Sequence, residues 1–223
     1  MNAGLSCTSG SSAGEKSARE DEFGTMNVSQ YDEIARGVNA PMYDYYAQKI
    51  KEKTGITKGI CLDAGSNGGY LGFSLARITD LDFIFLDVSK EGLDRAKAHI
   101  AGNGLQRRAH TLRADVHRIP LADESVNLVI SRGSIPFWED PARALKEIYR
   151  VIVKGGMAYV GGGRGTPEIQ ALAKDKMAAL GMEWPQGPNR LPQRDYDPIL
   201  RIAGIPRYAA ARGDDGMWIQ MWK

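Results

Sequence analysis

The sequence predicts an α/β fold in which a mostly parallel β-sheet is covered by helices on both faces. Short apolar runs of strand length alternate along the chain with longer amphipathic segments of helical periodicity. A glycine-rich stretch, residues 65–72, joins the first of these runs to the following helix. Strands that alternate with helices in this way form parallel sheets, because each helix crosses back over the sheet before the next strand.

The beginning of the chain is expected to contain a flexible leader and a helical lid. Residues 1–25 are rich in Ser, Gly, Glu and Lys, so they cannot bury enough apolar surface to offset the entropy of ordering. From residue 31 to residue 54, apolar side chains recur at three- and four-residue steps, which predicts a helical segment with a break at Pro41. Residues 26–223 are expected to form one domain, with residues 26–56 as the lid.

The middle of the chain carries the alternation of strands and helices. The predicted strands are residues 60–64, 83–87, 109–116, 126–131 and 157–160. A helix that contains Leu71 and Ile78 is expected after the first strand. Ser89 is expected to cap the next helix, and Asp140 followed by Pro141 marks the start of a third.

The last part of the chain predicts a short helix and an antiparallel hairpin. The helix is expected near residues 196–203, and two strand-like runs follow it at residues 207–211 and 217–222. Residues 214–216 read Asp-Asp-Gly and lie between the two runs. This composition is typical of a tight hairpin turn.

Composition limits the kinds of partner that the chain is expected to bind. Hydrophobic residues make up 43% of the 223 residues and charged residues 25%, which is typical of a globular domain. The formal net charge of +2 is too small to indicate a nucleic-acid or membrane partner. No run approaches the roughly 18 apolar residues that span a bilayer. The two cysteines, Cys7 and Cys61, are not expected to pair, and a cytoplasmic location is expected.

The glycine-rich stretch has the features of a ligand-binding turn. It follows a strand and opens a helix, so its backbone N–H groups and the helix N-terminus offer partial positive charge to a carboxylate or a phosphate. Glycines allow a ligand to approach the backbone closely and allow the chain to turn sharply. For this stretch alone, a tight turn that binds nothing remains the alternative interpretation.

Two aspartates follow the next two predicted strands. Asp87 ends the second strand, where a carboxylate can accept hydrogen bonds from both hydroxyls of a ribose. Asp115 ends the third strand, where a carboxylate could accept from the exocyclic amine of an adenine. Either residue alone is more often an ordinary turn residue. Because both lie at the carboxyl edge of the sheet beside the glycine-rich stretch, together they indicate an adenosine-containing ligand.

Four blocks of sequence occur in a characteristic order. They are residues 62–65 with Gly69, residues 86–89, residues 114–116 with 119–131, and residues 147–156. This ordered set resembles the class I S-adenosylmethionine-dependent methyltransferases that act on small molecules. The resemblance covers roughly residues 29–223. It implies a Rossmann-like, seven-stranded, mostly parallel sheet into which the C-terminal hairpin inserts an antiparallel strand, with helices on both faces.

The resemblance also implies S-adenosylmethionine as the cofactor. In this family Asp63 would help to hold the loop and the cofactor's amino group, and Asp87 would hold the ribose. The complete cofactor-binding set that the resemblance implies is Asp63, Gly65, Ser66, Asn67, Gly69, Asp87, Val88, Asp115, Val116 and Ser131. Asn67 departs from the family pattern, which usually has glycine there. Asparagine tolerates a left-handed backbone better than most residues, although its side chain could also narrow the cofactor pocket.

The methyl acceptor, expected to be a small molecule, would bind over the carboxyl ends of the fourth and fifth strands. Methyl transfer from a sulfonium is an in-line displacement in which the protein chiefly aligns the acceptor, so no catalytic triad is expected. The candidate substrate contacts are Tyr31, Arg132, Trp138 and Arg164. Structural alternatives stay open: a core aromatic for Tyr31, packing of its loop for Trp138, and a solvated side chain for Arg164.

The histidines and one long segment give weaker signals. His99, His110 and His117 share no metal-ligand spacing, so no metal site is expected. His99 is expected on a solvated helix face, whereas His117 could approach the edge of the adenine. Residues 181–197 are interpreted either as a substrate-side lid or as an ordinary long surface loop.

Three other functions stay open on the sequence alone. An NAD-dependent oxidoreductase also uses a glycine turn and an acidic residue after the second strand, but it prefers Gly-x-Gly-x-x-Gly to the Gly-x-x-Gly-Gly that begins at Gly65. An RNA or protein methyltransferase would use the arginines around the third strand, Arg107, Arg108, Arg113 and Arg118. A non-catalytic cofactor-binding protein is the third. Nucleic acid is not the expected partner, and the oligomeric state is left open.

Overall fold

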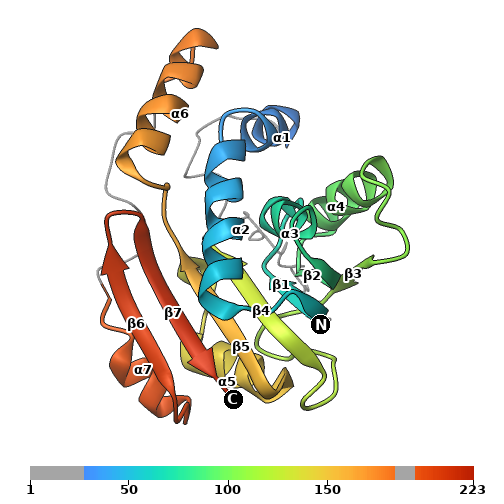
Figure 1. Cartoon of the computed structure of the whole chain (residues 1–223), viewed down its shortest axis with the longest axis vertical. Helices are drawn as coiled ribbons and strands as arrows, with labels where there is room; N and C mark the ends of the chain where they lie inside the picture. Colours follow the sequence, from blue (N-terminus) through green and yellow to red (C-terminus); the bar gives the residue numbers. More distant parts are fainter. Residues whose placement is uncertain (1–27, 184–193) are drawn as a thin grey trace, which may run out of the picture.

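A seven-stranded sheet forms the centre of the protein (Figure 1). The computed structural model describes residues 28–183 and 194–223, with side-chain surroundings from residue 32 onward. The strand order is β3-β2-β1-β4-β5-β7-β6, in which β1 to β5 are parallel and β7 is antiparallel to both of its neighbours. The strands are β1 (Lys58–Ala64), β2 (Asp80–Asp87), β3 (Ala109–Arg113), β4 (Val126–Arg132), β5 (Ile152–Gly162), β6 (Tyr208–Gly213) and β7 (Gly216–Trp222). The predicted α/β fold is confirmed.

Helices cover both faces of the sheet, as predicted (Figure 1). One face carries α2 (Ala40–Thr54), α3 (Tyr70–Ala76) and α4 (Lys90–Gly102), and the other carries α5 (Pro141–Val151) and α7 (Asp197–Ile202). Two hydrophobic clusters result, because side chains along a strand alternate between the faces. Along β1, for example, Cys61 belongs to the cluster under α2 to α4, and Leu62 belongs to the cluster under α5.

The strand order reverses at β1. The chain runs from β1 outward to β2 and β3, and then returns to pair β4 with the other side of β1. In open parallel sheets, ligands bind beside the carboxyl ends of the strands at such a point. The ends of β1, β2 and β4 therefore mark where the functional site is expected.

Local signals fix several helix boundaries where the sequence predicts them. The side chains of Ser89 and Asp140 accept backbone hydrogen bonds in the first turns of α4 and α5. The predicted break at Pro41 is confirmed, because α1 (Val28–Arg36) ends before it and α2 begins beside it. Ile78, predicted to lie inside α3, falls beyond the end of that helix.

Two strand boundaries differ from the prediction. β3 ends at Arg113, so Asp115 lies in the segment after the strand rather than at its end. β5 begins at Ile152, directly after α5, rather than at residue 157. Gly155 and Gly156 lie within this strand, where its register against β4 shifts. Glycine is suited to this irregularity, since Gly155 has a φ of 80°.

The helix α6 (Pro167–Ala179) is missing from the sequence prediction. The Thr166 side chain caps it by accepting from Ile169 N at 3.4 Å, and Pro167 occupies its first turn. These residues are typical of a helix start and could have revealed it. α6 extends away from the sheet (Figure 1) and packs against α1 and the residues that directly follow it. The contact is formed by Ile34, Val38, Ala173 and Met177.

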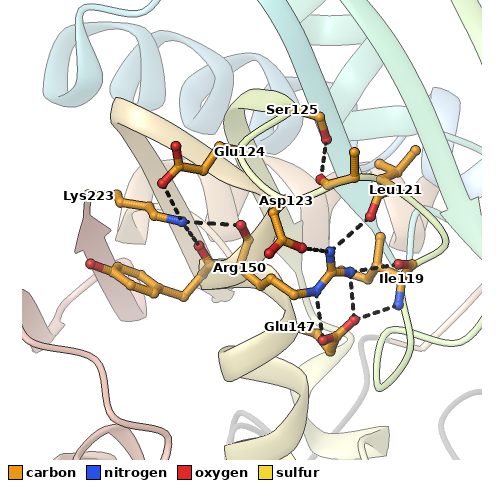
Figure 2. Close-up of polar contacts among 10 residues, drawn as sticks. Ile119, Leu121, Asp123, Glu124, Ser125, Glu147, Arg150 and Lys223 are labelled. Carbon is orange, nitrogen blue, oxygen red and sulfur yellow. Dashed lines mark hydrogen bonds and ion pairs between the residues drawn. The ribbon is translucent and has the colours of Figure 1, made fainter.

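A polar network fixes the segment between β3 and β4 to α5 (Figure 2). The Arg150 guanidinium donates to the backbone oxygens of Ile119 and Leu121 at 2.8 and 2.9 Å. It also contacts the carboxylates of Glu147 and Asp123, at 2.9 and 2.6 Å. Hydrogen bonding to Glu147 raises the pKa of Arg150 above its ordinary value. The network therefore holds in place the chain that leads from Asp115 to β4.

β6 and β7 form the predicted hairpin, and its turn folds back onto α2. The pairing of β6 with β7 extends to Gly213 and Gly216, so Asp214 and Asp215 form a two-residue turn between the strands. Tyr45 Oη donates to Asp215 Oδ2 at 2.8 Å, and Tyr46 Oη donates to the Asp215 backbone oxygen. α2 is thus bound to the sheet as a core helix. A lid function for residues 26–56 stays a prediction.

Candidate cofactor-binding site

The glycine-rich loop, residues 65–69, connects β1 to α3 at the carboxyl end of the sheet. Gly65 N and Ser66 N both donate to Leu86 O, at 2.8 and 3.0 Å, which ties the loop to the end of β2. Gly65 has a φ of 72°, and a Cβ at this position would come within 2.5 Å of Ser134 Cβ. Glycine is therefore required here by both the backbone conformation and the available space.

Asp63 lies beneath this loop, near the end of β1. Its side chain is buried, and its Oδ2 accepts a hydrogen bond from Gly72 N at 3.1 Å. Burial raises the pKa of Asp63 to about 7; the Gly72 N–H opposes this increase, and the charge of Asp87 adds to it. A cation beside Asp63 would favour the ionised carboxylate. The surroundings of Asp63 therefore suit the predicted contact with an amino group.

Asp87 ends β2 directly beside the loop. Its Oδ2 accepts from Asn67 N at 2.7 Å and its Oδ1 accepts from Ser89 N at 2.8 Å. The residue is 2% exposed, whereas Val88, the next residue, is 57% exposed. Backbone amides from the loop and from the start of α4 thus hold the Asp87 carboxylate at the edge where the ribose contact is predicted.

Asp115, Val116 and His117 form a turn after β3. Asp115 Oδ1 accepts from His117 N at 2.8 Å and from the Nδ1–H of the His117 ring. His117 Nε2 accepts from Asp140 N at 3.1 Å, so this arrangement places the ring proton on Nδ1. Although partial burial opposes the change, the hydrogen bonds from His117 lower the pKa of Asp115. Val116 is buried in the core, and contacts of this turn with an adenine stay predictions.

Three serines surround the start of the loop. Ser131 Oγ donates to Ala64 O at 2.7 Å and lies in hydrogen-bond contact with Ser134 Oγ, which connects β4 to the loop. Ser66 differs, because its buried Oγ has no hydrogen-bond partner among the residues that the structure describes. A buried hydroxyl without a partner is destabilising unless a ligand or water binds it. The Ser66 hydroxyl therefore fits a hydrogen-bonding group of a ligand, such as a carboxylate.

His99 contacts the loop, so the expectation of a solvated His99 is wrong. Its Nδ1 donates to Gly68 O at 2.8 Å, and its ring packs against Tyr70 and Phe73. Asp32 of α1 lies 3.3 Å from His99 Nε2 and accepts from Tyr70 Oη at 2.7 Å. The helical spacing of His99 from the apolar positions of α4 could have indicated that this side chain faces the protein.

Arg132 extends from the end of β4 toward α2, on the expected acceptor side. Its guanidinium donates to Gly163 O at 2.8 Å, contacts Met42 Sδ at 3.0 Å and lies 5.1 Å from the centroid of the Tyr43 ring. Its Nε is buried without a hydrogen-bond partner. Within residues 32–183 and 194–223, no carboxylate forms an ion pair with it.

The other candidate substrate contacts lie in different surroundings. Trp138 is 8% exposed and packs into the core cluster under α5, as its structural alternative expects. Arg164 is half-buried in the loop after β5. Tyr31 belongs to α1, but its side chain lies outside the described residues, and so does the part of the 181–197 segment from 184 to 193. Substrate roles for these residues stay predictions.

The described residues form neither a metal-binding cluster nor a membrane-spanning helix. In residues 28–183 and 194–223, no group of three or more His, Cys, Asp or Glu residues is placed to hold a metal ion. The helices in the same ranges are all too short or too polar to cross a bilayer. Cys61 is a buried free thiol, and Cys7 lies outside the described residues.

The fold and this site together define a class of protein. A Rossmann-like sheet, a glycine-rich loop after its first strand and an acidic residue at the end of the second form a site for an adenosine-containing cofactor. The family described as "Methyltransferase domain" matches residues 62–160, which run from the end of β1 into β5. The crystal structure of a candidate S-adenosyl-L-methionine-dependent methyltransferase from Methanococcus maripaludis is also similar. Its TM-score is 0.77 and its sequence identity 35%, over 87% of this chain and 91% of that chain.

This chain belongs to the S-adenosylmethionine-dependent methyltransferases, and S-adenosylmethionine is the cofactor of that family. Two curated relatives are similar over shorter stretches. A 2-methyl-6-phytyl-1,4-hydroquinone methyltransferase of rice is 30% identical over 44% of this chain, and a malonyl-[acyl-carrier protein] O-methyltransferase of Yersinia pestis is 27% identical over 67% of it. The matched stretches cover only 28% and 50% of these relatives' own lengths.

Proposed function

We propose that this chain transfers the methyl group of S-adenosylmethionine to a small-molecule acceptor by in-line displacement. The observation that carries the proposal is the meeting of Asp63, the glycine-rich loop and Asp87 where the strand order reverses. The cofactor, when bound, supplies an electrophilic methyl group on its sulfonium. The chain's own residues would hold the cofactor and align the acceptor atom with that methyl group.

The proposed cofactor contacts divide by chemistry. Ser66 Oγ would bind the carboxylate of the methionine part, and the Asp63 carboxylate would face its amino group. Asp87 would accept from the ribose hydroxyls, and Asp115 from the adenine amine. The remaining members of the set would contribute backbone or apolar contacts. They are Gly65, Asn67, Gly69, Val88, Val116 and Ser131.

Arg132 supports an acceptor that carries negative charge. A partly buried guanidinium loses hydration, and an anionic group beside it would offset this loss. Its contacts with Gly163, Met42 and Tyr43 hold the side chain in place without neutralising its charge. The names of the two curated relatives point to different acceptors, a phytyl-hydroquinone and a malonyl group on a carrier protein. The charge at Arg132 is therefore the more direct guide to the acceptor of this chain.

The arginines around β3 give less support to an RNA acceptor. Arg108 donates to the backbone oxygens of Thr79 and Ala76, and Arg113 donates to Val88 O. These two side chains thus help to hold neighbouring elements together. Fewer of the four arginines around β3 are therefore available to bind phosphates. A nucleic-acid or protein acceptor is the alternative to a small-molecule acceptor, and a methyl-transfer assay distinguishes the two. A cytoplasmic location stays a prediction from the sequence.

Methyl transfer from labelled cofactor tests the proposed function. Purified protein is incubated with methyl-labelled S-adenosylmethionine in separate assays that contain RNA, a protein extract, or a metabolite extract separated into anionic, neutral and cationic fractions. We expect S-adenosylhomocysteine to form together with a labelled product, enriched in the anionic fraction. Label that enters only RNA or protein would contradict a small-molecule acceptor. Binding of NAD without binding of S-adenosylmethionine would contradict the methyltransferase activity.

The role of Arg132 is tested by Arg132→Met, measured with the acceptor found in that screen. Loss of an ion pair to the acceptor is expected to lower kcat/KM about tenfold or more, because the acceptor's charge would be left unpaired. The affinity for S-adenosylmethionine should change little. Arg107→Met removes an exposed arginine elsewhere and serves as the matched control. Equal kcat/KM values for the two variants would argue against an anionic acceptor at Arg132.

A further inference from the structure

Asn67 adopts an uncommon backbone conformation in the middle of the cofactor loop. Its φ of 49° lies in the left-handed region, which residues other than glycine rarely enter. Its N–H donates to Asp87 Oδ2 at 2.7 Å. Its side chain lies against Gly92 of α4, where a Cβ would come within 3.1 Å of Asn67 Oδ1. Gly92 thus leaves the space that the asparagine side chain occupies.

Arg95, one turn after Gly92 on α4, binds the Asn67 side chain. Its Nη2 donates to Asn67 Oδ1 at 2.7 Å. Its Nε and Nη1 are buried and have no hydrogen-bond partner in the described part of the chain. A guanidinium has only donors and cannot lose its charge, so burying it with few acceptors is unfavourable. The hydrogen bond to Asn67 Oδ1 therefore gives the buried Arg95 guanidinium an acceptor that its other nitrogens lack.

These contacts connect α4 to the proposed ribose site. Arg95 donates to the Asn67 side chain, and the Asn67 backbone donates to Asp87. His99, one turn further along α4, donates to the next loop residue, Gly68. The spacing of three and four residues places Gly92, Arg95 and His99 on one face of the helix. This face contacts two successive residues of the loop.

We propose that Arg95 is a positioning residue, which holds the cofactor loop in its binding shape through the side chain of Asn67. This inference rests on the proposed cofactor site. It explains why this loop has asparagine where the backbone conformation favours glycine. Glycine at position 67 would relieve the left-handed backbone, but it would leave the Arg95 guanidinium without its acceptor. Replacing Asn67 by glycine is therefore harmful only while Arg95 is present.

A double-mutant cycle tests this dependence with S-adenosylhomocysteine as the probe, because its binding requires no acceptor. The proteins are the unchanged chain, Asn67→Gly, Arg95→Met and the double variant, and Kd is measured by calorimetry. Each single variant is expected to bind about tenfold more weakly, as loss of a hydrogen bond to a charged group implies. The double variant should bind no more weakly than Arg95→Met alone, because both changes remove the same bond. Arg95→Lys, which keeps a cationic donor, should recover part of the affinity.

Controls separate positioning from a general loss of structure. Lys97→Met changes a cation on the exposed side of α4 and should leave Kd unchanged. Circular dichroism and thermal unfolding show whether each variant is folded at the temperature of the binding measurement. A purely structural role would lower the unfolding temperature of Arg95→Met and leave the Kd of the folded protein unchanged, which would overturn the inference.

Two further outcomes are distinguishable. If the unchanged chain binds S-adenosylhomocysteine but the effects of Asn67→Gly and Arg95→Met on binding free energy simply add, the inference fails and the proposed function stands. If the unchanged chain binds neither S-adenosylhomocysteine nor S-adenosylmethionine, the proposed function fails first and the inference fails with it.

Discussion

Asp63 combines an ionisable side chain with nearly complete burial beneath the cofactor loop. Burial is the main reason why its pKa is raised to about 7. Near neutral pH the folded protein therefore contains both the protonated and the ionised form of this carboxyl group. A cationic amino group would bind the ionised form better. Binding of the cofactor is then linked to loss of a proton from Asp63.

We expect the affinity for S-adenosylmethionine to rise as pH increases from about 6 to about 7.5 and to level off above that. The sign follows from the raised pKa, because ionisation is complete only above it. Asp63→Asn should bind more weakly and show a flatter pH profile in the same range. Calorimetric titrations at several pH values measure this. Equal pH profiles for the two proteins would contradict a direct contact of Asp63 with the amino group.

Two helices beside the site, α2 and α5, are held to the rest of the protein by different polar contacts. α2 is bound to the hairpin turn through Tyr45, Tyr46 and Asp215, so it covers the sheet as a core helix. α5 is bound to the segment between β3 and β4 through Arg150, which reaches backbone oxygens and carboxylates together (Figure 2). Hydrogen bonding to Arg150 lowers the pKa of Glu147, so the ionised Glu147 is stabilised by folding.

This network predicts a dependence of stability on pH. Because the pKa of Glu147 is lower in the folded than in the unfolded chain, its contribution is complete above the ordinary pKa and is lost as pH falls through the lowered one. Arg150→Met should reduce the free energy of unfolding by about 2 kcal/mol at pH 7. Glu147→Gln should lose less stability than the unchanged chain when the pH is lowered from 7 to about 4.

Urea unfolding at both pH values measures these changes. Lys146→Met alters an exposed cation of the same helix and should leave the free energy of unfolding nearly unchanged. If Glu147→Gln and the unchanged chain lose the same stability on acidification, folding does not stabilise the ionised form of Glu147, which would contradict the prediction.

At the scale of the whole molecule, the features that the sequence predicts correctly are those that depend on residues close together in the chain. The strand and helix alternation, the caps at Ser89 and Asp140, and the final hairpin all follow from residues close together in the chain. The prediction for His99 is wrong because it overlooks the helical spacing that places His99 beside the apolar face of α4; its partner Gly68, in a separate segment, has no local signal. The contact between Arg95 and Asn67 joins two separate elements, so no periodicity reveals it. The cofactor and substrate roles of the individual site residues stay predictions.

Ligand binding should stabilise the molecule as a unit, because the proposed site joins the ends of several strands. S-adenosylhomocysteine at one hundred times its Kd is expected to add about 2.7 kcal/mol to the free energy of unfolding. Asp87→Ala should bind too weakly to gain this stabilisation at the same ligand concentration. Thermal unfolding with and without ligand measures both. A similar increase with NAD, or an undiminished increase in Asp87→Ala, would contradict the proposed cofactor site.

The position of β7 has a consequence for synthesis of the chain. β7 lies between β5 and β6, so β5 acquires its second neighbour only from residues 216–222. On the ribosome, a nascent chain that has emerged only as far as β5 exposes an unpaired strand edge with the groups needed for β-pairing. Such edges are prone to intermolecular association. The interval between translation of β5 and that of β7 is therefore a period in which the nascent chain is open to association through the free edge of β5.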